Sequence, residues 1–455
     1  MDDTEFIDAI SPWLADNDGP IGARLTLAIR QAISTGQLAP RQRLPPERVL
    51  AKALHVSRPT VSGVIDELRS SGLVSSRQGS GTWITGTEQR REPPVPFVEM
   101  IQATGRIDLA AATAPDASWL PQTRIETADL LTSEPANGLI PMGLWPLREA
   151  VARRASAFVS GTTAENVIIT SGAHQALALV VASLAPRGST VLVEDTTYGG
   201  LVDIIRANGC HAVGVTRDND GVLPDELSDL MKRHRPSITT LVSSVHSPTG
   251  TVSSPSRCAA LAEVLHNAPT HVVLDETYAD LEFTPSGRPL CTALGDRSIR
   301  IGSLSKTLWT GLRTGWVIAP AEVCEALTGR RWQQFDLGPS VASQLIALQS
   351  LDGIEDRLIK RRHSLEERAA WTRDAIATAF PDWVPTVVDG GLAMWIELPV
   401  DGATFAGEAA AMGVAVLAGS ACRADNVDTP HIRLCFDRPI DVLETALERL
   451  VRTNA

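Results

Sequence analysis

The sequence predicts a multidomain protein in which a small α+β module precedes a larger α/β body. The chain has 455 residues, which is too long for one hydrophobic core and suits two or three domains. Its net charge of −12 is unevenly distributed, because residues 24–91 carry eleven basic and four acidic side chains whereas residues 1–23 carry six acids and no base. Helical periodicity near the N-terminus later gives way to apolar, β-rich runs that alternate with helix-length segments.

Composition excludes several classes of protein. No apolar run approaches the roughly 20 residues that cross a bilayer, and the N-terminus Met1–Glu5 is acidic where a secretory signal would be basic. The six cysteines are scattered without a Cys-x-x-Cys pair, which argues against a zinc site or a disulfide framework. We therefore expect a cytoplasmic protein with free thiols, no metal centre and no membrane partner.

The basic module has the element order of a DNA-binding fold. Apolar spacing predicts helices over residues 25–33 and 47–54, and a third helix that begins after the cap Ser57 and ends at Gly72. Two short strands then flank a glycine-containing turn at residues 78–81. Three helices followed by a hairpin predict a winged helix-turn-helix, whose second motif helix would enter a major groove. A charge run alone is more often a solvated face, but this pattern favours a nucleic-acid partner.

This module resembles the GntR family of bacterial regulators. Residues 43–48 (Arg-Leu-Pro-Pro-Glu-Arg), 56–61 (Val-Ser-Arg-Pro-Thr-Val) and 77–82 (Arg-Gln-Gly-Ser-Gly-Thr) are similar to that family's three signature stretches, in order and at its spacing. The resemblance implies that five residues meet DNA: Arg48, Arg58 and Thr60 on the helices, and Gln78 and Gly79 at the wing. For Arg58, phosphate contact is favoured over base readout, because most such contacts only position the protein. The alternative is a plain surface residue at a helix start.

Residues 87–106 are predicted to be a linker, because they are charged, then proline-rich, and lack periodicity. The predicted domains are therefore a DNA-binding domain over residues 1–86 and a body over residues 107–455.

The body contains seven strand candidates with helix-length connections between them. Near-continuous apolar strands of this kind predict a largely parallel sheet covered on both faces, with ligands at the carboxyl ends of the strands. The candidates are residues 167–170, 191–194, 212–215, 239–242, 271–274, 299–302 and 316–319.

One lysine in the body stands out because the chain has few. The four lysines are Lys52, Lys232, Lys306 and Lys360. Lys306 lies between Ser303, Ser305 and Arg313 in a stretch rich in small hydroxyl residues. A primary amine can lose its proton in a desolvated site and attack an aldehyde, whereas a guanidinium stays protonated. The motif therefore predicts pyridoxal 5'-phosphate (PLP) on Lys306, with Ser303, Ser305 and Arg313 as donors to its phosphate.

Other residues suited to this cofactor follow predicted strands. Asp275 could pair with a pyridinium nitrogen, and Tyr278 could hydrogen-bond the phenolic oxygen. The segment 171–173 opens a helix whose N–H groups can receive a phosphate, and Tyr198 offers a flat face for stacking. Taken singly, an aspartate that ends a strand is usually a cap and Ser-Gly-Ala is a common turn. Together, in order and each at a strand end, these residues indicate one site.

From Asp108 onward the chain resembles fold-type I aminotransferases, which have a large and a small subdomain, and the whole chain resembles the MocR subfamily of GntR regulators. The resemblance implies Lys306 as the imine-forming residue, with Asp275 on the pyridine nitrogen. It also implies a cofactor set completed by Tyr278 on the phenolic oxygen, Tyr198 against the ring, and Gly172, Ala173, Ser303, Ser305 and Arg313 at the phosphate. Arg433 falls where the family binds a substrate carboxylate; taken alone, it would more often be a surface ion-pair partner.

Three departures from the family pattern stand out. Residues 247–250 read Ser-Pro-Thr-Gly where aminotransferases have Asn-Pro-Thr-Gly, so the amide that bonds the phenolic oxygen is absent. Gly138 stands where many relatives place a tyrosine that reaches the partner subunit's phosphate. Trp309-Thr310 replaces a commoner pair of a small residue and proline, a change without an interpretation from sequence.

Two functions fit these features, and a third conflicts with them. The favoured one is a PLP-dependent regulator that senses an amino compound or the cofactor itself, with at most weak or half-transamination activity. A working aminotransferase with an accessory DNA-binding domain shares every cofactor residue. A regulator with a degenerate body that binds no PLP conflicts with the intact lysine, aspartate and tyrosine set. In each case the family implies a homodimer.

Overall fold

The computed structural model describes most of the body and the core elements of the basic module. The described residues are 6–7, 9–10, 21–34, 38, 42–54, 56–70, 73–77, 81–84, 97, 101, 105–131, 135 and 137–451. The chain divides into two compact units, Met1–Val95 and Pro96–Ala455. Each is treated by itself below.

The first unit contains the predicted three helices and hairpin. Its elements are α2 (Ile21–Ser34), α3 (Glu47–Ala53), α4 (Arg58–Ser70), β1 (Val74–Arg77) and β2 (Gly81–Ile84). The two strands pair antiparallel, with Val74 opposite Ile84. Ser57 caps α4 as expected, because its Oγ accepts the N–H of Thr60 at 3.2 Å. Leu25, Ile65 and Leu68 belong to the buried core that joins the helices. The winged helix-turn-helix prediction is confirmed, while Gln78 and Gly79 lie outside the described residues.

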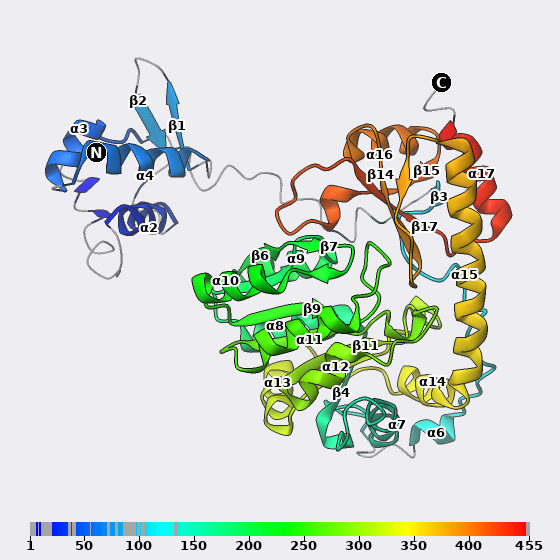
Figure 1. Ribbon diagram of the computed structural model, residues 1–455. Coiled ribbons are helices and arrows are strands. Elements are labelled where there is room, and N and C mark those ends of the chain that lie inside the picture. The colour runs from blue at the N-terminus through cyan, green and yellow to red at the C-terminus, as the bar shows by residue number, and fades with distance from the viewer. Residues whose placement is uncertain are drawn as a thin grey trace. The chain divides into compact units, whose positions relative to one another are not determined.

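The second unit has a large subdomain built on one seven-stranded sheet within the described residues (Figure 1). The spatial order is β4-β12-β11-β10-β9-β5-β6. Every neighbouring pair is parallel except the two that involve β12. The strands are β4 (Val167–Thr170), β5 (Thr190–Glu194), β6 (His211–Val215), β9 (Ile238–Val242), β10 (His271–Asp275), β11 (Ser298–Ser303) and β12 (Gly315–Ile318). All seven predicted strands are therefore present in a largely parallel sheet.

Helices cover both faces of this sheet because its strands are apolar on both sides. On one face α8, α9 and α13 pack against alternate residues such as Ile168 and Val193. On the other face α10, α11 and α12 contact residues such as Leu192 and Leu274, while α7 and α14 pack on β4 and β12. The helices are α7 (Trp145–Ala155), α8 (Ala173–Leu184), α9 (Gly199–Ala207), α10 (Pro224–His234), α11 (Pro255–His266), α12 (Pro289–Leu294), α13 (Ala321–Gln334) and α14 (Val341–Leu351).

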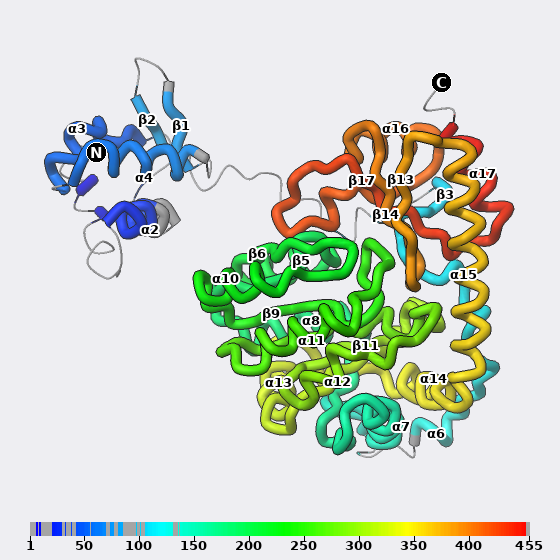
Figure 2. The backbone as a smooth tube through the Cα atoms, in the orientation of Figure 1, coloured from blue at the N-terminus to red at the C-terminus, as the bar shows by residue number. Residues whose placement is uncertain are grey.

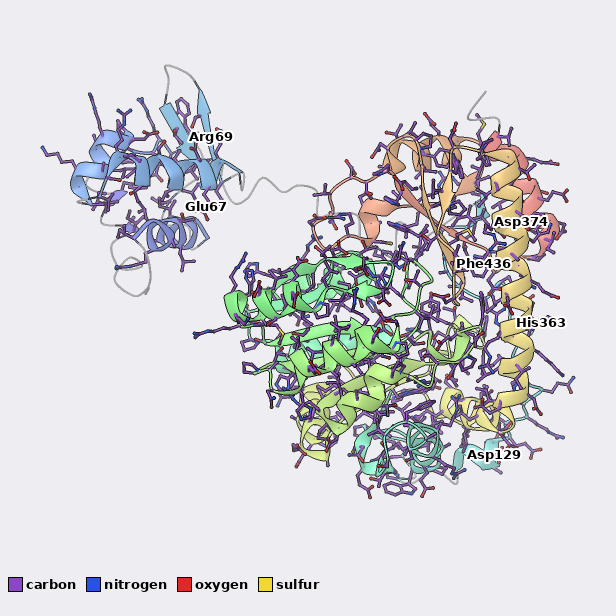
Figure 3. All side chains as sticks on the ribbon, in the orientation of Figure 1. Glu67, Arg69, Asp129, His363, Asp374 and Phe436 are labelled. Atoms are coloured by element: carbon purple, nitrogen blue, oxygen red, sulfur yellow. The ribbon has the colours of Figure 1, made fainter. Side chains whose placement is uncertain are left out.

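A long helix, α15 (Ile354–Ala379), leads from α14 to a small subdomain (Figure 2). There the sheet order is β13-β14-β17-β16, and β3 pairs with β15. Phe436, labelled in Figure 3, is fully buried in the core of this subdomain, whereas His363 and Asp374 on α15 each have side chains 73 % exposed. The elements are β3 (Ile107–Asp108), β13 (Val384–Pro385), β14 (Ala393–Glu397), α16 (Gly402–Ala411), β15 (Val414–Ala415), β16 (Leu417–Ala418), β17 (His431–Cys435) and α17 (Ile440–Val451).

Shorter elements complete the second unit. They are α6 (Thr127–Leu131), β7 (Arg217–Asp218), β8 (Gly221–Val222) and the 3-10 turns Ala164–Asn166, Ala279–Leu281, Gly295–Arg297, Thr310–Leu312 and Gly419–Cys422. All six cysteines are buried free thiols. Of the helices in the described part of the chain, none has the length and apolar character needed to cross a membrane.

Candidate functional site

A cavity of about 470 Å³ lies at the carboxyl ends of β4, β5, β10 and β11, where the sheet topology predicts a ligand. Every residue that the sequence assigned to the cofactor or to the effector lines it. They are Gly172, Ala173, Tyr198, Asp275, Tyr278, Ser303, Ser305, Lys306, Arg313 and Arg433.

Lys306 is held with its amine inside this cavity. Its Nζ donates to the carbonyl oxygen of Ala112 at 2.7 Å and lies 5.8 Å from the centre of the Tyr278 ring. Burial, together with the positive charge of Arg433, lowers the pKa of Lys306 to about 8. Part of the population therefore carries a neutral, nucleophilic amine near neutral pH, which imine chemistry requires.

Asp275 is a buried carboxylate at the end of β10. Its Oδ1 accepts the N–H of Thr277 at 2.8 Å, and no salt bridge to it exists within the described residues. Burial raises the pKa of Asp275 above its ordinary value. A cationic ring nitrogen beside it would offset that cost, because an opposite charge favours the ionised form.

Tyr278 lies close to the serine that replaces the family's asparagine. The Tyr278 hydroxyl donates to the carbonyl oxygen of Ala112 at 3.5 Å, and the nearby Ser247 side chain acts to lower the pKa of Tyr278. Burial raises the pKa of Tyr278, so this phenol stays protonated and remains a donor. Ser247 lines the cavity as well, so a second hydroxyl stands at the position where the amide is missing.

The expected phosphate groups form a cradle at the start of α8. Gly172 precedes this helix with φ 121°, and a Cβ on it would lie 3.5 Å from Nη2 of Arg313. Arg313 is exposed and makes no hydrogen bond or ion pair within the described residues. Ser303 Oγ lies 2.9 Å from Ser305 Oγ. Free helix N–H groups, a free guanidinium and two hydroxyls together suit a phosphate dianion.

Arg433 enters the cavity from β17 of the small subdomain. It is 4 % exposed, and its Nη2 donates to the carbonyl oxygen of Ala110 at 2.6 Å. Its Nε is buried without a hydrogen-bond partner within the described residues. The alternative of a surface ion pair is therefore wrong, and the guanidinium retains capacity for an incoming acid group.

Two further residues at Tyr198 were not predicted from sequence. His174 Nδ1 lies 3.2 Å from the Tyr198 hydroxyl, and burial lowers the pKa of His174 so that it is neutral at pH 7. Phe97 contacts the Tyr198 ring edge-on, with ring centres 5.0 Å apart. His174 directly follows the segment 171–173, so its proximity was a usable signal. Phe97 gave none, because it lies in the predicted linker.

A buried polar network supports the cavity floor and was also missed. Glu194 Oε2 pairs with Nε of Arg217 at 3.2 Å and lies 3.1 Å from Nε2 of His246. Burial raises the pKa of Glu194, while burial and Arg217 lower the pKa of His246, which is therefore neutral. His246 precedes Ser247, so the network fixes the loop that carries this serine.

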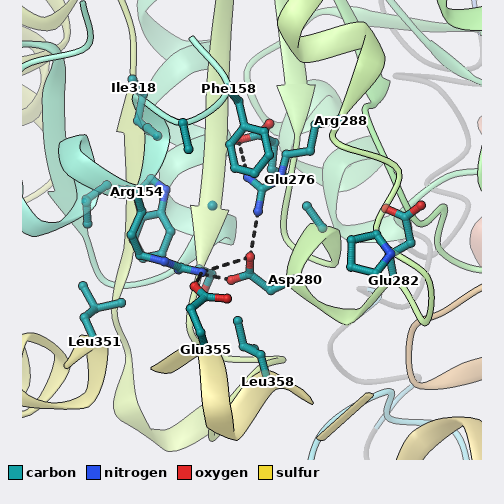
Figure 4. Close-up of a pocket in the computed structure, with 18 of the residues that line it drawn as sticks. Arg154, Phe158, Glu276, Asp280, Glu282, Arg288, Ile318, Leu351, Glu355 and Leu358 are labelled. Carbon is teal, nitrogen blue, oxygen red and sulfur yellow. Dashed lines mark hydrogen bonds and ion pairs between the residues drawn. The ribbon is translucent and has the colours of Figure 1, made fainter. Parts of the chain in front are cut away.

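A second cavity, of about 380 Å³, lies behind the segment that carries Asp275 and Tyr278 (Figure 4). Asp280 stands at its centre and accepts hydrogen bonds from Arg154 at 3.3 Å and from Arg288 at 2.7 Å. Burial alone would raise the pKa of Asp280, but Arg154 and Arg288 outweigh it and lower that pKa. The cluster thereby holds the segment that carries Asp275 and Tyr278 on the side away from the first cavity.

The structure shows the surroundings of the two remaining departures. Trp309 packs over Gly311, where a Cβ would lie only 2.2 Å from Cζ2 of the indole. Gly138 has a φ of 71° and lies next to Val341. A Cβ added to Gly138 would be 3.8 Å from Cγ2 of Val341.

Three predicted DNA-facing residues lie in the described part of the first unit. Arg48 on α3 is exposed, and the side chain of Arg58 at the start of α4 is 73 % exposed. The Nε of Arg58 is 3.4 Å from Oε2 of Glu47, a surface contact of little energetic weight. Thr60 is half-buried and shares a 2.7 Å hydrogen bond with Ser57. The two arginines are therefore available to phosphates.

Two family models match this chain. Residues 22–84 match "Bacterial regulatory proteins, gntR family", and residues 105–450 match "Aminotransferase class I and II". The two matches follow each other in the order of a regulatory module and an aminotransferase-like body.

Individual proteins are similar over most of their length. The uncharacterized HTH-type transcriptional regulator YisV of Bacillus subtilis is 27 % identical over 430 residues, covering 86 % of this chain and 88 % of that protein. The vitamin B6 salvage pathway transcriptional repressor PtsJ of Salmonella typhimurium is 31 % identical over 322 residues, covering 69 % and 72 %. Among solved structures, the α-aminoadipate aminotransferase LysN of Thermus thermophilus, complexed with N-(5'-phosphopyridoxyl)-L-leucine, superposes with a TM-score of 0.67 at 25 % identity, covering 78 % of this chain and 96 % of that one.

Proposed function

Because the chain belongs to the aminotransferase class I and II family and also carries a gntR-family domain, we propose that it is a DNA-binding transcription regulator. This combination of domains is typical of the MocR subfamily. We further propose that its body binds PLP and senses an amino compound or the cofactor itself. The observation that carries this proposal is the convergence of Lys306, Asp275, Tyr278 and Arg433 on one cavity in a chain that also has a winged helix-turn-helix. The regulator names of its relatives favour it over a working aminotransferase.

The residues of the cavity fit PLP. When bound, the cofactor supplies an aldehyde carbon and an electron-withdrawing ring. Lys306 is the amine that attaches it, Asp275 is the carboxylate for the ring nitrogen, and Tyr278 is the donor to the phenolic oxygen. Tyr198 would lie against the ring. Gly172, Ala173, Ser303, Ser305 and Arg313 would hold the phosphate, and the unpaired state of Arg313 supports this role.

The effector we propose carries both an amine and an acid group. Arg433 would take the acid group through a charge-assisted hydrogen bond, for which its buried Nε is available because it has no hydrogen-bond partner within the described residues. The effector's amine would take the attachment point in place of Lys306, and the proton that the incoming ammonium group gives up would pass to the freed Lys306 amine. Lys306, Arg313 and Arg433 are the lysine and arginine residues that line the cavity, and the first two are committed to the cofactor. Apart from its amine, the effector should therefore carry a single acid group.

We also propose that Arg48, Arg58, Thr60, Gln78 and Gly79 bind duplex DNA, with Arg58 on phosphate. Exposure of Arg48 and Arg58 supports this assignment. The electrostatic part of such binding weakens as salt rises, because phosphate contacts release counterions.

A homodimer is the proposed assembly. Leu139 and Leu337 have side chains 48 % and 53 % exposed, and Trp145 is 46 % exposed. The segments of the two leucines lie side by side, since a Cβ on Gly338 would be 2.5 Å from the carbonyl oxygen of Ile140. Neighbouring apolar side chains at this exposure are typical of an interface. Gly138 directly precedes Leu139, so a residue other than the family's tyrosine would complete the partner's site.

The test uses the full-length protein and a duplex selected by that protein from a random library. DNA affinity is measured at fixed salt with PLP, with individual amino acids and with amino sulfonates, and α-keto acid products are assayed in the same mixtures. We expect at least one amino compound or PLP to change DNA affinity while turnover stays at most slow. Rapid multiple turnover with unchanged DNA affinity would instead favour the aminotransferase. A purified protein that takes up no PLP would overturn both.

A further inference from the structure

Phe97 joins the ligand cavity to the part of the chain that leads towards the DNA-binding unit. It follows Ile84, the last residue of β2, by 13 positions, and it belongs to the second unit. Its ring is 3 % exposed and lines the cavity of Lys306 and Arg433. A residue this close to the module boundary is thus also part of the wall of the site.

The ring of Phe97 contacts two residues proposed to bind ligand. It lies edge-on to Tyr198, and the guanidinium carbon of Arg433 lies 5.7 Å from its centre. Gly199 makes room for it, because a Cβ there would approach Cδ2 of Phe97 to 2.4 Å. Phe97 therefore touches both the stacking residue and the acid-binding residue.

The backbone of Phe97 is fixed to the large subdomain. Its N–H donates to Oδ2 of Asp203 on α9 at 2.7 Å, and its carbonyl oxygen accepts the N–H of Ile101 at 3.3 Å. The ring packs with Trp395, Leu417 and other buried residues of the small subdomain. Phe97 thus lies at the junction of the two subdomains, with its backbone on one and its ring against the other.

An acid group bound to Arg433 would change this contact. The ring faces a guanidinium whose charge is at present offset by one carbonyl oxygen, that of Ala110. A carboxylate forms a stronger interaction with arginine than an aromatic face does, so the acid group sets the position of the guanidinium. The contact between the Phe97 ring and Arg433 would weaken as a result. The hydrogen bond from the Phe97 N–H to Asp203 would stay in place, because the acid group does not compete for it.

We propose that Phe97 detects the acid group of a ligand bound at Arg433 and passes its presence to the adjoining chain that leads to the DNA-binding unit. This inference rests on the proposed function and adds the residue through which ligand and DNA affinity are linked. Such linkage requires the ligand to distinguish two states, and here the two states differ in the packing of one ring. Typical couplings of this kind change affinity about 5- to 150-fold.

Two compounds isolate the acid group. N-(5'-phosphopyridoxyl)-L-leucine presents a phosphate, a ring, an isobutyl side chain and a carboxylate, whereas its decarboxylated counterpart, N-(5'-phosphopyridoxyl)-3-methylbutylamine, differs only in lacking the carboxylate. The apoprotein is loaded with each compound, loading is measured by absorbance, and the affinity of each form for the selected duplex is compared at one salt concentration. For the parent protein we expect the two forms to differ at least fivefold. Equal DNA affinities of the two loaded forms would overturn the inference.

Variants locate the coupling. In Phe97→Leu, both compounds should still load, but the two forms should bind DNA within twofold of each other. Asp203→Ala removes the hydrogen-bond acceptor of the Phe97 N–H and leaves the ring. It should also reduce the difference in DNA affinity between the two loaded forms, and it replaces Phe97→Leu as the test if that variant does not fold. Phe158→Leu is the matched control, because this ring also lies under an arginine, 4.3 Å from Arg288, but lines the other cavity; its difference should equal that of the parent.

The outcomes separate this inference from the proposed function. Failure of the parent to load either compound would refute the cofactor assignment, and failure of both loaded forms to bind any duplex would refute the DNA assignment. A full parental difference in Phe97→Leu would leave both assignments intact and refute only the role of Phe97.

Discussion

The Nζ of Lys306 and the carbonyl oxygen of Ala112, 194 positions apart in sequence, are joined by a 2.7 Å hydrogen bond. The same carbonyl lies 3.5 Å from the Tyr278 hydroxyl. Ala112 therefore holds both the amine proposed to attach the cofactor and the neighbouring Tyr278 hydroxyl, and it does so through a backbone carbonyl that no side-chain motif identifies.

Attachment of PLP should require Lys306 and should depend on pH. The pKa of about 8 means that the neutral amine increases as pH rises through that value, so the rate at which apoprotein takes up PLP should rise between pH 7 and 9 and then level off. Arg433→Gln should move the midpoint upward, because the positive charge of Arg433 helps to lower this pKa. Stopped-flow absorbance measures both. A rate independent of pH would contradict the assignment.

Borohydride reduction followed by peptide mass spectrometry should find the cofactor on Lys306. Lys306→Ala should lose this label and keep the fold, as measured by circular dichroism. Lys232→Ala is the control, since that side chain is 74 % exposed and lies outside the cavity. Label on another lysine of the parent protein would refute the assignment.

Replacing Arg58 should weaken DNA binding. Arg58→Ala should reduce the slope of log affinity against log salt by about one if the side chain contacts phosphate, or cost about 1–3 kcal/mol at selected sequences if it reads a base. Arg69→Ala on the same helix is the control, because Arg69 is paired with Asp66 and Ser76. Mobility shifts at several salt concentrations provide the measurement, and equal behaviour of both variants would remove Arg58 from the interface.

The exposed leucines Leu139 and Leu337 should be covered by a partner subunit in solution. Leu337→Asp should convert a dimer to a monomer at micromolar concentration, because it places a charge in a desolvated interface. Val387→Asp, at a side chain 66 % exposed in the small subdomain, should leave the mass unchanged. Light scattering distinguishes the two, and a monomeric parent would refute the dimer.

Asp280 should stabilise the body at neutral pH. Asp280→Asn leaves Arg154 and Arg288 without their shared carboxylate, which should lower the free energy of unfolding by about 3 kcal/mol. Because the pKa of folded Asp280 is lowered, its contribution is complete above the ordinary aspartate pKa of about 3.9 and is lost as pH falls through the folded value. The difference between variant and parent should therefore shrink only in strong acid.

Urea unfolding at pH 7 and at pH 3 measures this effect. Asp374→Asn is the control, because Asp374 pairs with Arg373 at the surface of α15 with its side chain 73 % exposed, so it should change stability by less than about 0.5 kcal/mol. If Asp280→Asn lowers the free energy of unfolding no more than Asp374→Asn does, the cluster around Asp280 does not stabilise the body.

The sequence by itself determined the element types and most of the site. Seven apolar runs predicted the strands of the large sheet, because a strand buried on both faces needs apolar residues at successive positions. The order of functional residues after those strands predicted that they would meet, since parallel strands end at one edge. Ser57 and the apolar spacing that follows it likewise predicted α4.

Only the tertiary structure decided which other groups complete that site. Phe97 and the carbonyl of Ala112 approach Tyr198 and Lys306 through chain folding, and neither periodicity nor a motif indicates their contacts. The burial of Arg433 and the lowered pKa of Lys306 also arise from packing, because desolvation depends on what surrounds a charge and not on its neighbours in sequence. Local pattern thus identified the chemistry of the chain, whereas long-range contacts set the electrostatics under which that chemistry operates.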